Sequence, residues 1–317
     1  FFFKQKTAYE RGVRLVGSEM CIRDRANVPA SAVTLVFHGT TLATNALIER
    51  KGAKTALVAT EGFRDSIEIA YEHRFEQYAL YMERPQPLVA RDWRFTVPER
   101  MAADGEVLLP LDEDAVRLLA SELAALQVDS VAVCFLHSYA NGDHEQRAGE
   151  ILAEALPNVS ITLSSVVCPE IREYDRMSTT CANAYVQPLM AGYLGRLQEG
   201  LREMGVGCPM LLMMSSGGVT TVETAAAIPI RLVESGPAGG AILARDIAKE
   251  NDLDTGLSFD MGGTTAKITL IDDFTPQIAR SFEVARMYRF LKGSGLPLRI
   301  PVIDMVEIGA GGGSIAE

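Results

Sequence analysis

The chain has 317 residues, of which 48% are hydrophobic and 22% are charged, and this composition is that of an ordinary globular protein. Such a length predicts roughly two domains, each with its own core. The formal net charge of −11 argues against a nucleic-acid partner, because phosphate backbones are bound by clustered Lys and Arg. No apolar run approaches the roughly 20 residues of a membrane span, so we expect no membrane partner.

The five cysteines lie far apart in the sequence and form no CxxC pair. Their spacing indicates neither a disulfide framework nor a thiolate zinc site, and it fits a reducing compartment. We therefore expect a cytoplasmic protein.

Residues 1–25 differ from the rest of the chain. They contain six basic and three acidic residues, and they show neither a helical period nor strand alternation. They also lack the apolar region of a secretory signal. The string resembles translated sequencing-adapter read-through, so we interpret 1–25 as non-native. We accordingly expect the natural N-terminus to lie upstream of Ala26 and to be missing.

From Ala26 onward, short apolar runs alternate with segments of helical period. This alternation predicts βαβ units on a largely parallel sheet. Asp112 is a plausible N-cap for the expected helix 112–126. The segment 71–100 is polar, aromatic and rich in proline, so we interpret it as an excursion from the core in which substrate specificity would lie. The expected strands are 32–37, 54–59, 130–135 and 160–163, and the expected helices are 42–50, 112–126 and 144–156.

The second half of the chain opens with a long predicted helix over 179–204, which contains Pro188 and could cross between two domains. We place the domains at 26–165 and 166–317. The sequence stops just after a strand-like run at 306–308, so we expect the C-terminus to be truncated. The remaining expected strands are 210–214, 257–259 and 267–271, and the remaining helices are 222–227 and 241–250.

The turn between the two strands at 257–271 reads Asp260-Met-Gly262-Gly263-Thr264-Thr265. Adjacent glycines let several main-chain N–H groups converge on one phosphate, the threonine hydroxyls add donors, and a preceding carboxylate can organise Mg²⁺. The alternative is a plain hairpin in which Gly-Gly satisfies a tight turn. We predict phosphate binding by Gly262, Gly263, Thr264 and Thr265.

Three more glycine clusters follow apolar runs, at 215–219, 234–240 and 308–314. Ligands bind at the carboxyl ends of parallel strands, and the N–H groups at a helix start favour anions. The alternative is that each cluster serves only a turn or close packing. We predict that Gly236, Gly239, Gly240, Gly311 and Gly312 contact a cofactor. The sequence contains neither a Walker A motif nor a Rossmann GxGxxG motif.

His38 and His137 each follow an expected strand, and His144 lies one loop later. With a carboxylate such as Asp143 or Glu145 they could bind zinc or manganese as a second divalent metal. The alternative is that His38 caps a helix and His137 bonds to a loop carbonyl.

Several motifs occur in fixed order over 26–317: HGTTLATNALIERKG, FLHSYANGDHE, PEIREYDR, SSGGV, ESGPAGG, FDMGGTTAK and GAGGGSIA. Together they resemble the hydantoinase A/5-oxoprolinase family. The resemblance implies the two-domain α/β actin-like ATPase fold, ATP and Mg²⁺ as cofactors, a small cyclic amide as substrate and a B-type hydantoinase subunit as partner. It also implies that DMGGTTAK is the second of two phosphate loops and that the first is absent, so the chain alone should be a poor ATPase. Ala266-Lys267 stands where many members carry Thr-Asp.

The resemblance implies roles for three further residues. Asp260 would organise Mg²⁺ or orient the nucleophile, while Glu173 and Arg176 would touch the active cleft or the hinge between domains. A run such as 169–176 is more usually a solvated helix start. The implied activity is ATP-dependent hydrolysis of a cyclic amide. An acetone- or acetophenone-type carboxylase subunit and a sugar-kinase-like or regulatory ATPase are the alternatives.

Overall fold

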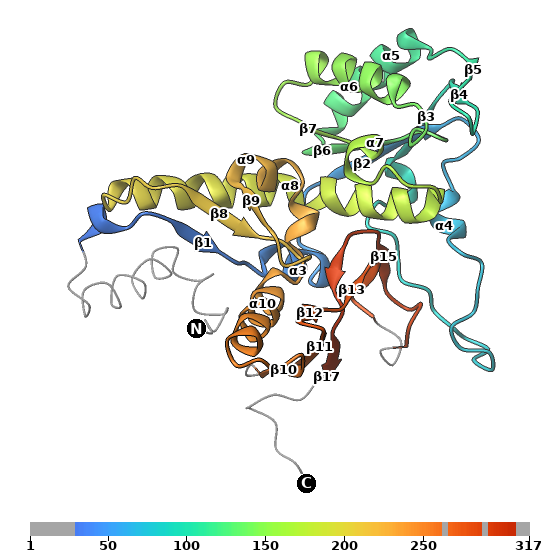
Figure 1. Ribbon diagram of the computed structural model, residues 1–317. Coiled ribbons are helices and arrows are strands. Elements are labelled where there is room, and N and C mark those ends of the chain that lie inside the picture. The colour runs from blue at the N-terminus through green and yellow to red at the C-terminus, as the bar shows by residue number, and fades with distance from the viewer. Residues whose placement is uncertain (1–28, 262–265, 287–290, 309–317) are drawn as a thin grey trace.

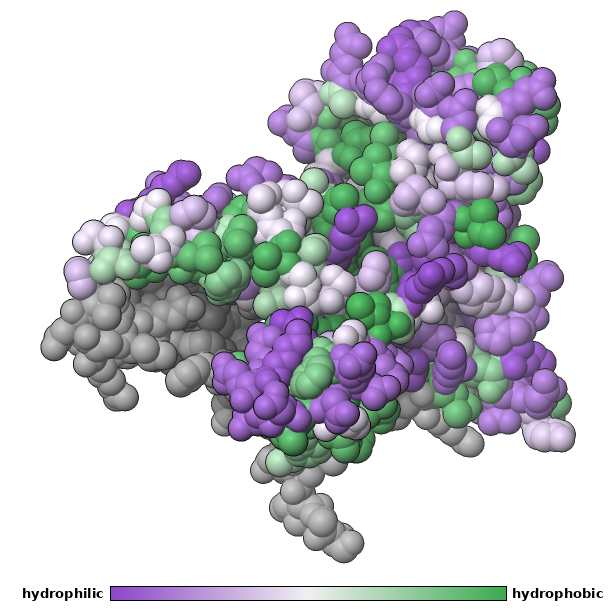
Figure 2. Space-filling view, in the orientation of Figure 1, coloured by the Kyte–Doolittle hydropathy of each residue, from purple (hydrophilic) through white to green (hydrophobic). Residues whose placement is uncertain are grey.

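The computed structural model describes residues 29–261, 266–286 and 291–308. Two lobes are joined by the long helix α8 (Glu173–Glu203), which runs along the middle of the molecule (Figure 1). In Figure 2, hydrophilic residues dominate the outer surface of the upper lobe and of α10 (Ser235–Glu250), and hydrophobic residues gather between them. Within the described ranges, no helix has both the length and the apolar character needed to cross a bilayer.

The first lobe is built on a four-stranded parallel sheet in the order β3 (Arg94–Val97), β2 (Thr55–Thr60), β6 (Ser130–Cys134), β7 (Ser160–Leu163). Successive side chains of a strand point to opposite faces. One face packs against α5 (Glu113–Leu126) and α6 (Asp143–Ala155), and the other packs against α8. The parallel βαβ arrangement predicted from the alternation of strands and helices is therefore confirmed.

The segment 71–100 contributes more to the core than the sequence indicated. Its last part forms η2 (Arg91–Trp93) and β3, and β3 pairs with β2 as an edge strand of the sheet. The interpretation of 71–100 as an excursion is thus wrong for 91–97. Nearby lie α4 (Ser66–Ile69) and the small hairpin β4 (Arg100–Met101) and β5 (Val107–Leu109).

The start of α5 agrees with the sequence prediction, whereas the start of α8 does not. Asp112 caps α5, since its carboxylate accepts a hydrogen bond from the Ala115 N–H at 2.9 Å. Helix α8 begins at Glu173, six residues before the expected start, and continues through Pro188. Every residue from Asp175 to Val186 is buried, as expected of a helix that passes between two packed layers. The predicted crossing between the two halves of the chain is confirmed.

The two larger sheets described in the second lobe have three and four strands. In one, β1 (Val36–His38) pairs parallel with β8 (Met210–Met213), and β9 (Val219–Thr221) pairs antiparallel with β8. A core of buried residues joins this sheet to the second half of α8, to α3 (Leu42–Ile48), α9 (Val222–Ala227) and η3 (Pro229–Leu232). The glycines at 217–218 form the turn of the β8–β9 hairpin. Gly217 has φ +82° and packs against Ile242, so a turn explains this cluster.

The last sheet contains β10 (Thr255–Met261), β11 (Ala266–Asp272), β12 (Thr275–Pro276) and β17 (Val306–Ile308). Helix α10 packs on it and begins at Ser235, where the sequence indicated 241. The residues before α10 are the 3-10 helix η3, so the predicted strand before 234–240 is wrong. The remaining short elements are η1 (Ala30–Ala32), α7 (Ser164–Val167), β13 (Ile278–Ala279), β14 (Phe282–Val284), β15 (Leu296–Leu298) and β16 (Val302–Ile303).

Candidate functional site

The loop after β1 and the start of α10 meet closely. Thr40 donates its main-chain N–H to Ser235 Oγ at 3.3 Å, and that hydroxyl donates to the Thr40 carbonyl at 3.1 Å. A Cβ built on Gly39 would lie 3.8 Å from Gly236 Cα. Two segments separated by 195 residues in the sequence are therefore fixed against each other by main-chain contacts. Sequence reasoning quoted both motifs but did not foresee that they touch.

Strand β10 brings Asp260 to the same helix. The Oδ2 atom of Asp260 lies 3.9 Å from the position that a Cβ would occupy at Gly240. Gly236 and Gly240 are four residues apart in α10, so they share one face of the helix. Gly236 is exposed, and no atom lies within 4 Å of its Cβ position. The helix start thus offers bare main chain next to a carboxylate.

Lys267 closes this group of residues. It lies directly opposite Asp260 on the neighbouring strand, and it forms an ion pair with Glu234, the residue that precedes α10. A second carboxylate, that of Glu307 on β17, lies 3.6 Å from Lys267 Nζ. Glu234 is buried, adopts a left-handed conformation with φ +61°, and donates its N–H to Thr44 Oγ1. Sequence analysis treated Lys267 only as a departure from the family pattern and missed Glu234.

Some of the predicted cofactor residues lie in α10, and the others lie outside the residues that the structure describes. Gly236, Gly239 and Gly240 lie in the first two turns of α10, and Gly239 packs against the Met213 side chain. The other predicted cofactor residues, namely Gly262, Gly263, Thr264, Thr265, Gly311 and Gly312, lie outside the described residues. The strands that flank 262–265 are β10 and β11, which pair antiparallel with Met261 opposite Ala266.

Arg176 lies inside the first lobe. Its guanidinium is fully buried, and it donates to the carbonyls of Phe135 and Glu170 at 3.0 Å each and to Ser164 Oγ at 3.2 Å. These bonds tie the start of α8 to the end of β6 and to α7. These donors are used by the protein itself, so Arg176 holds the start of α8 in place, and its contact with an active cleft or with the hinge between domains stays a prediction. Glu173 is about one-third exposed and lies 3.8 Å from Arg176.

Glu145 completes this buried polar group, and sequence analysis considered it only as a metal ligand. Its carboxylate is fully buried and accepts from the Phe135 N–H at 2.8 Å, from Ser164 Oγ at 2.6 Å and from the Ser165 N–H at 2.7 Å. Glu145 and Arg176 share Ser164 as a hydrogen-bond partner. Two buried charges are in this way satisfied by local donors and acceptors.

The three histidines proposed as metal ligands make separate contacts. His38 Nε2 bonds to the Tyr193 hydroxyl at 2.8 Å, and burial lowers the pKa of His38 to about 4, so this ring is neutral at pH 7. His144 Nδ1 lies 2.8 Å from Glu99 Oε2, and His137 Nδ1 lies 3.5 Å from the Tyr139 hydroxyl. Across the residues that the structure describes, no three His, Cys, Asp or Glu side chains form a group that could hold a metal ion.

Comparison with known proteins identifies the family to which this arrangement belongs. Residues 4–156 match the family model described as the hydantoinase/oxoprolinase N-terminal region, and residues 176–317 match the model described as hydantoinase/oxoprolinase. The chain belongs to the hydantoinase/oxoprolinase family. The first match begins inside the segment 1–25 that the sequence analysis set apart.

Relatives within the hydantoinase/oxoprolinase family have been named for two kinds of reaction. The caprolactamase subunit alpha of Pseudomonas jessenii is 35% identical over 284 residues, which are 89% of this chain and 40% of that protein. The crystal structure of the ATP-dependent caprolactamase from Pseudomonas jessenii has a TM-score of 0.82 at 32% identity, covering 96% of this chain and 44% of that one. A nucleotide-free acetone carboxylase structure has a TM-score of 0.76 at 25% identity, covering 89% of this chain and 40% of that one.

These similarities confirm the predicted actin-like ATPase fold for this hydantoinase/oxoprolinase chain. The described part of the chain has the mixed α/β architecture with a parallel sheet that this fold requires. The chain spans less than half the length of the relatives named above. The two solved structures are of ATP-dependent enzymes, and the caprolactamase relative is a subunit alpha.

Proposed function

We propose that this chain is part of the A-type subunit of a cytoplasmic, ATP-dependent enzyme that hydrolyses a cyclic amide. The observation that carries the proposal is the meeting of three segments at the start of α10. Ser235 bonds to Thr40, Asp260 approaches Gly240, and Lys267 pairs with Glu234. The strands that bring Asp260 and Lys267 together are joined by the Gly-Gly-Thr-Thr sequence at 262–265.

The residues present fit a nucleoside triphosphate with Mg²⁺. Phosphate needs main-chain N–H groups without obstruction by side chains, and the open Cβ position of Gly236 at a helix start meets that need. Asp260 is the carboxylate available to hold Mg²⁺ or its waters. Lys267 is held by two carboxylates, so its main effect is to fix β11 against the start of α10.

ATP would supply the phosphoryl group that makes the poorly electrophilic ring carbonyl open to attack by water. The task of the chain is then to position the terminal phosphate and to stabilise its charge. Fixed main-chain N–H groups at the start of α10 perform that task without rearrangement. Glu173 stays a candidate for contact with the reacting groups, because its side chain is partly exposed at the start of α8.

A cyclic-amide substrate is favoured by the caprolactamase likeness, which has the higher identity and TM-score of the two solved structures. A B-type subunit is the proposed partner, in keeping with the name of the relative as a subunit alpha. An ATP-dependent carboxylase subunit is the second candidate, and the acetone carboxylase structure is the observation that favours it.

ADP release separates the two candidates. The full-length protein that contains this chain is mixed with a B-type hydantoinase subunit, ATP and Mg²⁺, and ADP is measured with a panel of lactams and hydantoins or with ketones plus bicarbonate. The proposal expects ADP release that rises with a cyclic amide and does not need bicarbonate. ADP release that requires both a ketone and bicarbonate would instead support the carboxylase. A matched Asp260→Asn variant should lower the rate, while Asp272→Asn, at the other end of β11 and exposed, should not.

A further inference from the structure

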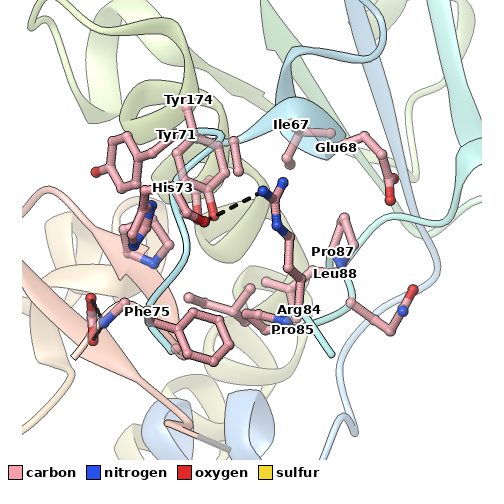
Figure 3. Close-up of a pocket in the computed structure, with 18 of the residues that line it drawn as sticks. Ile67, Glu68, Tyr71, His73, Phe75, Arg84, Pro85, Pro87, Leu88 and Tyr174 are labelled. Atoms are coloured by element: carbon pink, nitrogen blue, oxygen red, sulfur yellow. Dashed lines mark hydrogen bonds between the residues drawn. The ribbon is translucent and has the colours of Figure 1, made fainter. Parts of the chain in front are cut away.

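A pocket lies between the two lobes, away from the start of α10. It is lined by α4 and the loop that follows it, by residues 84–88, by α8 and by the β14–β15 hairpin (Figure 3). Its enclosed volume is about 70 Å³ and it opens onto solvent, so it can take only a small molecule or part of one. None of the residues that place Ser235, Asp260 and Lys267 belongs to its lining.

Aromatic rings and prolines form one part of the wall of this pocket. Tyr71 and Tyr174 meet edge to face with ring centroids 4.8 Å apart, and the His73 ring lies 5.5 Å from Tyr71. The Tyr71 hydroxyl donates to Asp175, and burial raises the pKa of Tyr174 to about 12, so both phenols stay protonated. His73 packs onto Gly293, where φ is +94° and a Cβ would lie 2.6 Å from His73 Nε2. The shape of this wall therefore depends on glycine at 293.

Arg84 carries the positive charge of the pocket. Its guanidinium donates to the carbonyls of Ile69 and His73 at 3.3 and 3.4 Å, and Figure 3 shows it between the aromatic rings and Glu68. A guanidinium has five N–H groups, and these bonds are long, so donors are left for a ligand. In the described part of the chain, Arg84 forms no ion pair with a carboxylate.

Three carboxylates line the pocket, those of Glu68, Glu72 and Glu283, and two of them already contact cations of the protein. Glu283 accepts from the Gly293 N–H and from Arg286, and Glu68 accepts from the buried Arg94 at 2.7 Å. Glu68 is nevertheless half exposed, and a carboxylate can accept about four hydrogen bonds. The pocket thus presents a guanidinium that can bind a carboxylate, a carboxylate that can accept from an ammonium group, and an apolar wall.

We propose that this pocket binds a small amino acid, with its carboxylate on Arg84 and its ammonium group toward Glu68. Arginine binds carboxylates in a two-point geometry, and a carboxylate accepts charge-assisted hydrogen bonds from an ammonium group. Hydrolysis of a cyclic amide frees one amine and one carboxylate, so the ring-opened product is a molecule of this class. That link rests on the proposed function, whereas the binding itself does not.

Isothermal titration of the full chain without nucleotide tests the proposal. The probes are 4-aminobutanoate, 5-aminopentanoate and 6-aminohexanoate, with hexanoate, hexylammonium and ε-caprolactam as probes that lack one or both charges. At least one amino acid should bind about tenfold more tightly than each singly charged or neutral probe, a difference of about 1.4 kcal/mol. If no amino acid in the series binds more tightly than the singly charged and neutral probes, the assignment is overturned.

Two variants separate recognition from folding. Arg84→Gln should weaken amino-acid binding about tenfold or more, because a charge-assisted hydrogen bond is lost. Arg74→Gln is the control, since Arg74 lies in the same loop, also bonds to a main-chain carbonyl and is not in the lining. Unfolding midpoints of both variants show whether they fold, and Arg84→Lys, which keeps the charge, should bind better than Arg84→Gln. Unchanged affinity in a folded Arg84→Gln variant would contradict the proposal.

The same titrations distinguish this inference from the proposed function. Asp260→Asn should weaken the binding of ATP with Mg²⁺ and leave amino-acid binding unchanged. If ATP binds but no amino acid is preferred, the assignment of the pocket is contradicted and the proposed nucleotide site is not. Absence of ATP binding with intact amino-acid selectivity would contradict the proposed nucleotide site and would still support the amino-acid pocket.

Discussion

The carboxylate of Asp260 lies against Gly240, with its Oδ2 atom 3.9 Å from the place of a Cβ on that glycine. The contact joins β10 to the second turn of α10 and places a negative charge beside bare helix main chain. A glycine inside a helix lowers its stability by about 1 kcal/mol relative to alanine. A cluster of three such residues in α10 is consistent with a need for close approach rather than for helix stability.

Gly240 therefore offers a graded test of that contact. Gly240→Ala adds a methyl group at ordinary contact distance, so we expect a gain of up to about 1 kcal/mol in unfolding free energy and little change in ATP binding. Gly240→Leu should displace Asp260 and weaken the binding of ATP with Mg²⁺ about tenfold. Urea unfolding and calorimetric titration measure the two effects. Equal ATP affinity in both variants would show that the contact is not part of the site.

The Lys267–Glu234 pair should be important for the stability of the second lobe. Both side chains are at most 15% exposed, so Lys267→Met leaves a mostly buried carboxylate without its main partner. We expect a loss of about 2–3 kcal/mol in unfolding free energy, at or below the range for broken buried pairs. The double variant Lys267→Met/Glu234→Gln should recover part of it.

The exposed Arg245–Asp246 pair is the control for that experiment. Its side chains are 29% and 51% exposed, so Arg245→Met should cost less than about 1 kcal/mol. Similar losses for Lys267→Met and Arg245→Met would contradict the role given to the buried pair.

His38 predicts a specific dependence of stability on pH. Burial lowers its pKa to about 4 in the folded chain, against about 6.5 in the unfolded chain. Below pH 6.5 the His38 ring binds a proton in the unfolded chain but not in the folded chain. The free energy of unfolding therefore decreases as the pH falls from 6.5 to 4. We expect a loss of about 2 kcal/mol between pH 7.5 and 5. His38→Gln should remove about that much of the slope in urea unfolding, and an unchanged slope would be inconsistent with a buried neutral His38.

Arg176 is expected to act on stability and not on nucleotide binding. Arg176→Met leaves the carbonyls of Phe135 and Glu170 without their donors, so we expect a loss of about 3 kcal/mol or more. The affinity of the folded fraction for ATP with Mg²⁺ should not change. A stable Arg176→Met variant with weakened ATP binding would support the expectation that Arg176 reaches an active cleft.

The periodic elements could be predicted because their apolar residues face a core. Strand β2, helix α5 and helix α9 appear within one residue of their expected bounds. The start of α8 was missed because Glu173–Ser178 has no apolar period, and the polar side chains of Asp175 and Arg176 are buried through hydrogen bonds instead. The start of α10 was missed because glycines and Pro237 disfavour a helix in general, although proline is tolerated in a first turn.

The candidate site could be predicted only in its parts. Glycine clusters and Asp260 signal phosphate chemistry by residue type, but the contact between Thr40 and Ser235 spans 195 residues and has no local signal. His38 and His137 each follow an expected strand, yet His38 belongs to a different sheet from the strand that precedes His137. A pattern of strand ends cannot tell which sheet each strand joins, so the expected cluster did not form. Lys267 and Glu234 are far apart in sequence and become a pair only through the β10–β11 register.

Hydrogen–deuterium exchange with a non-hydrolysable ATP analogue and Mg²⁺ tests the central claim most directly. The claim is that main-chain N–H groups at the start of α10 and around the β10–β11 connection hold the phosphates. Peptides that cover 234–240 and 258–268 should exchange more slowly when the analogue is added at millimolar concentration, while a peptide covering α5 (Glu113–Leu126) should not change. Unchanged exchange in both peptides, with slower exchange elsewhere in the chain, would contradict it.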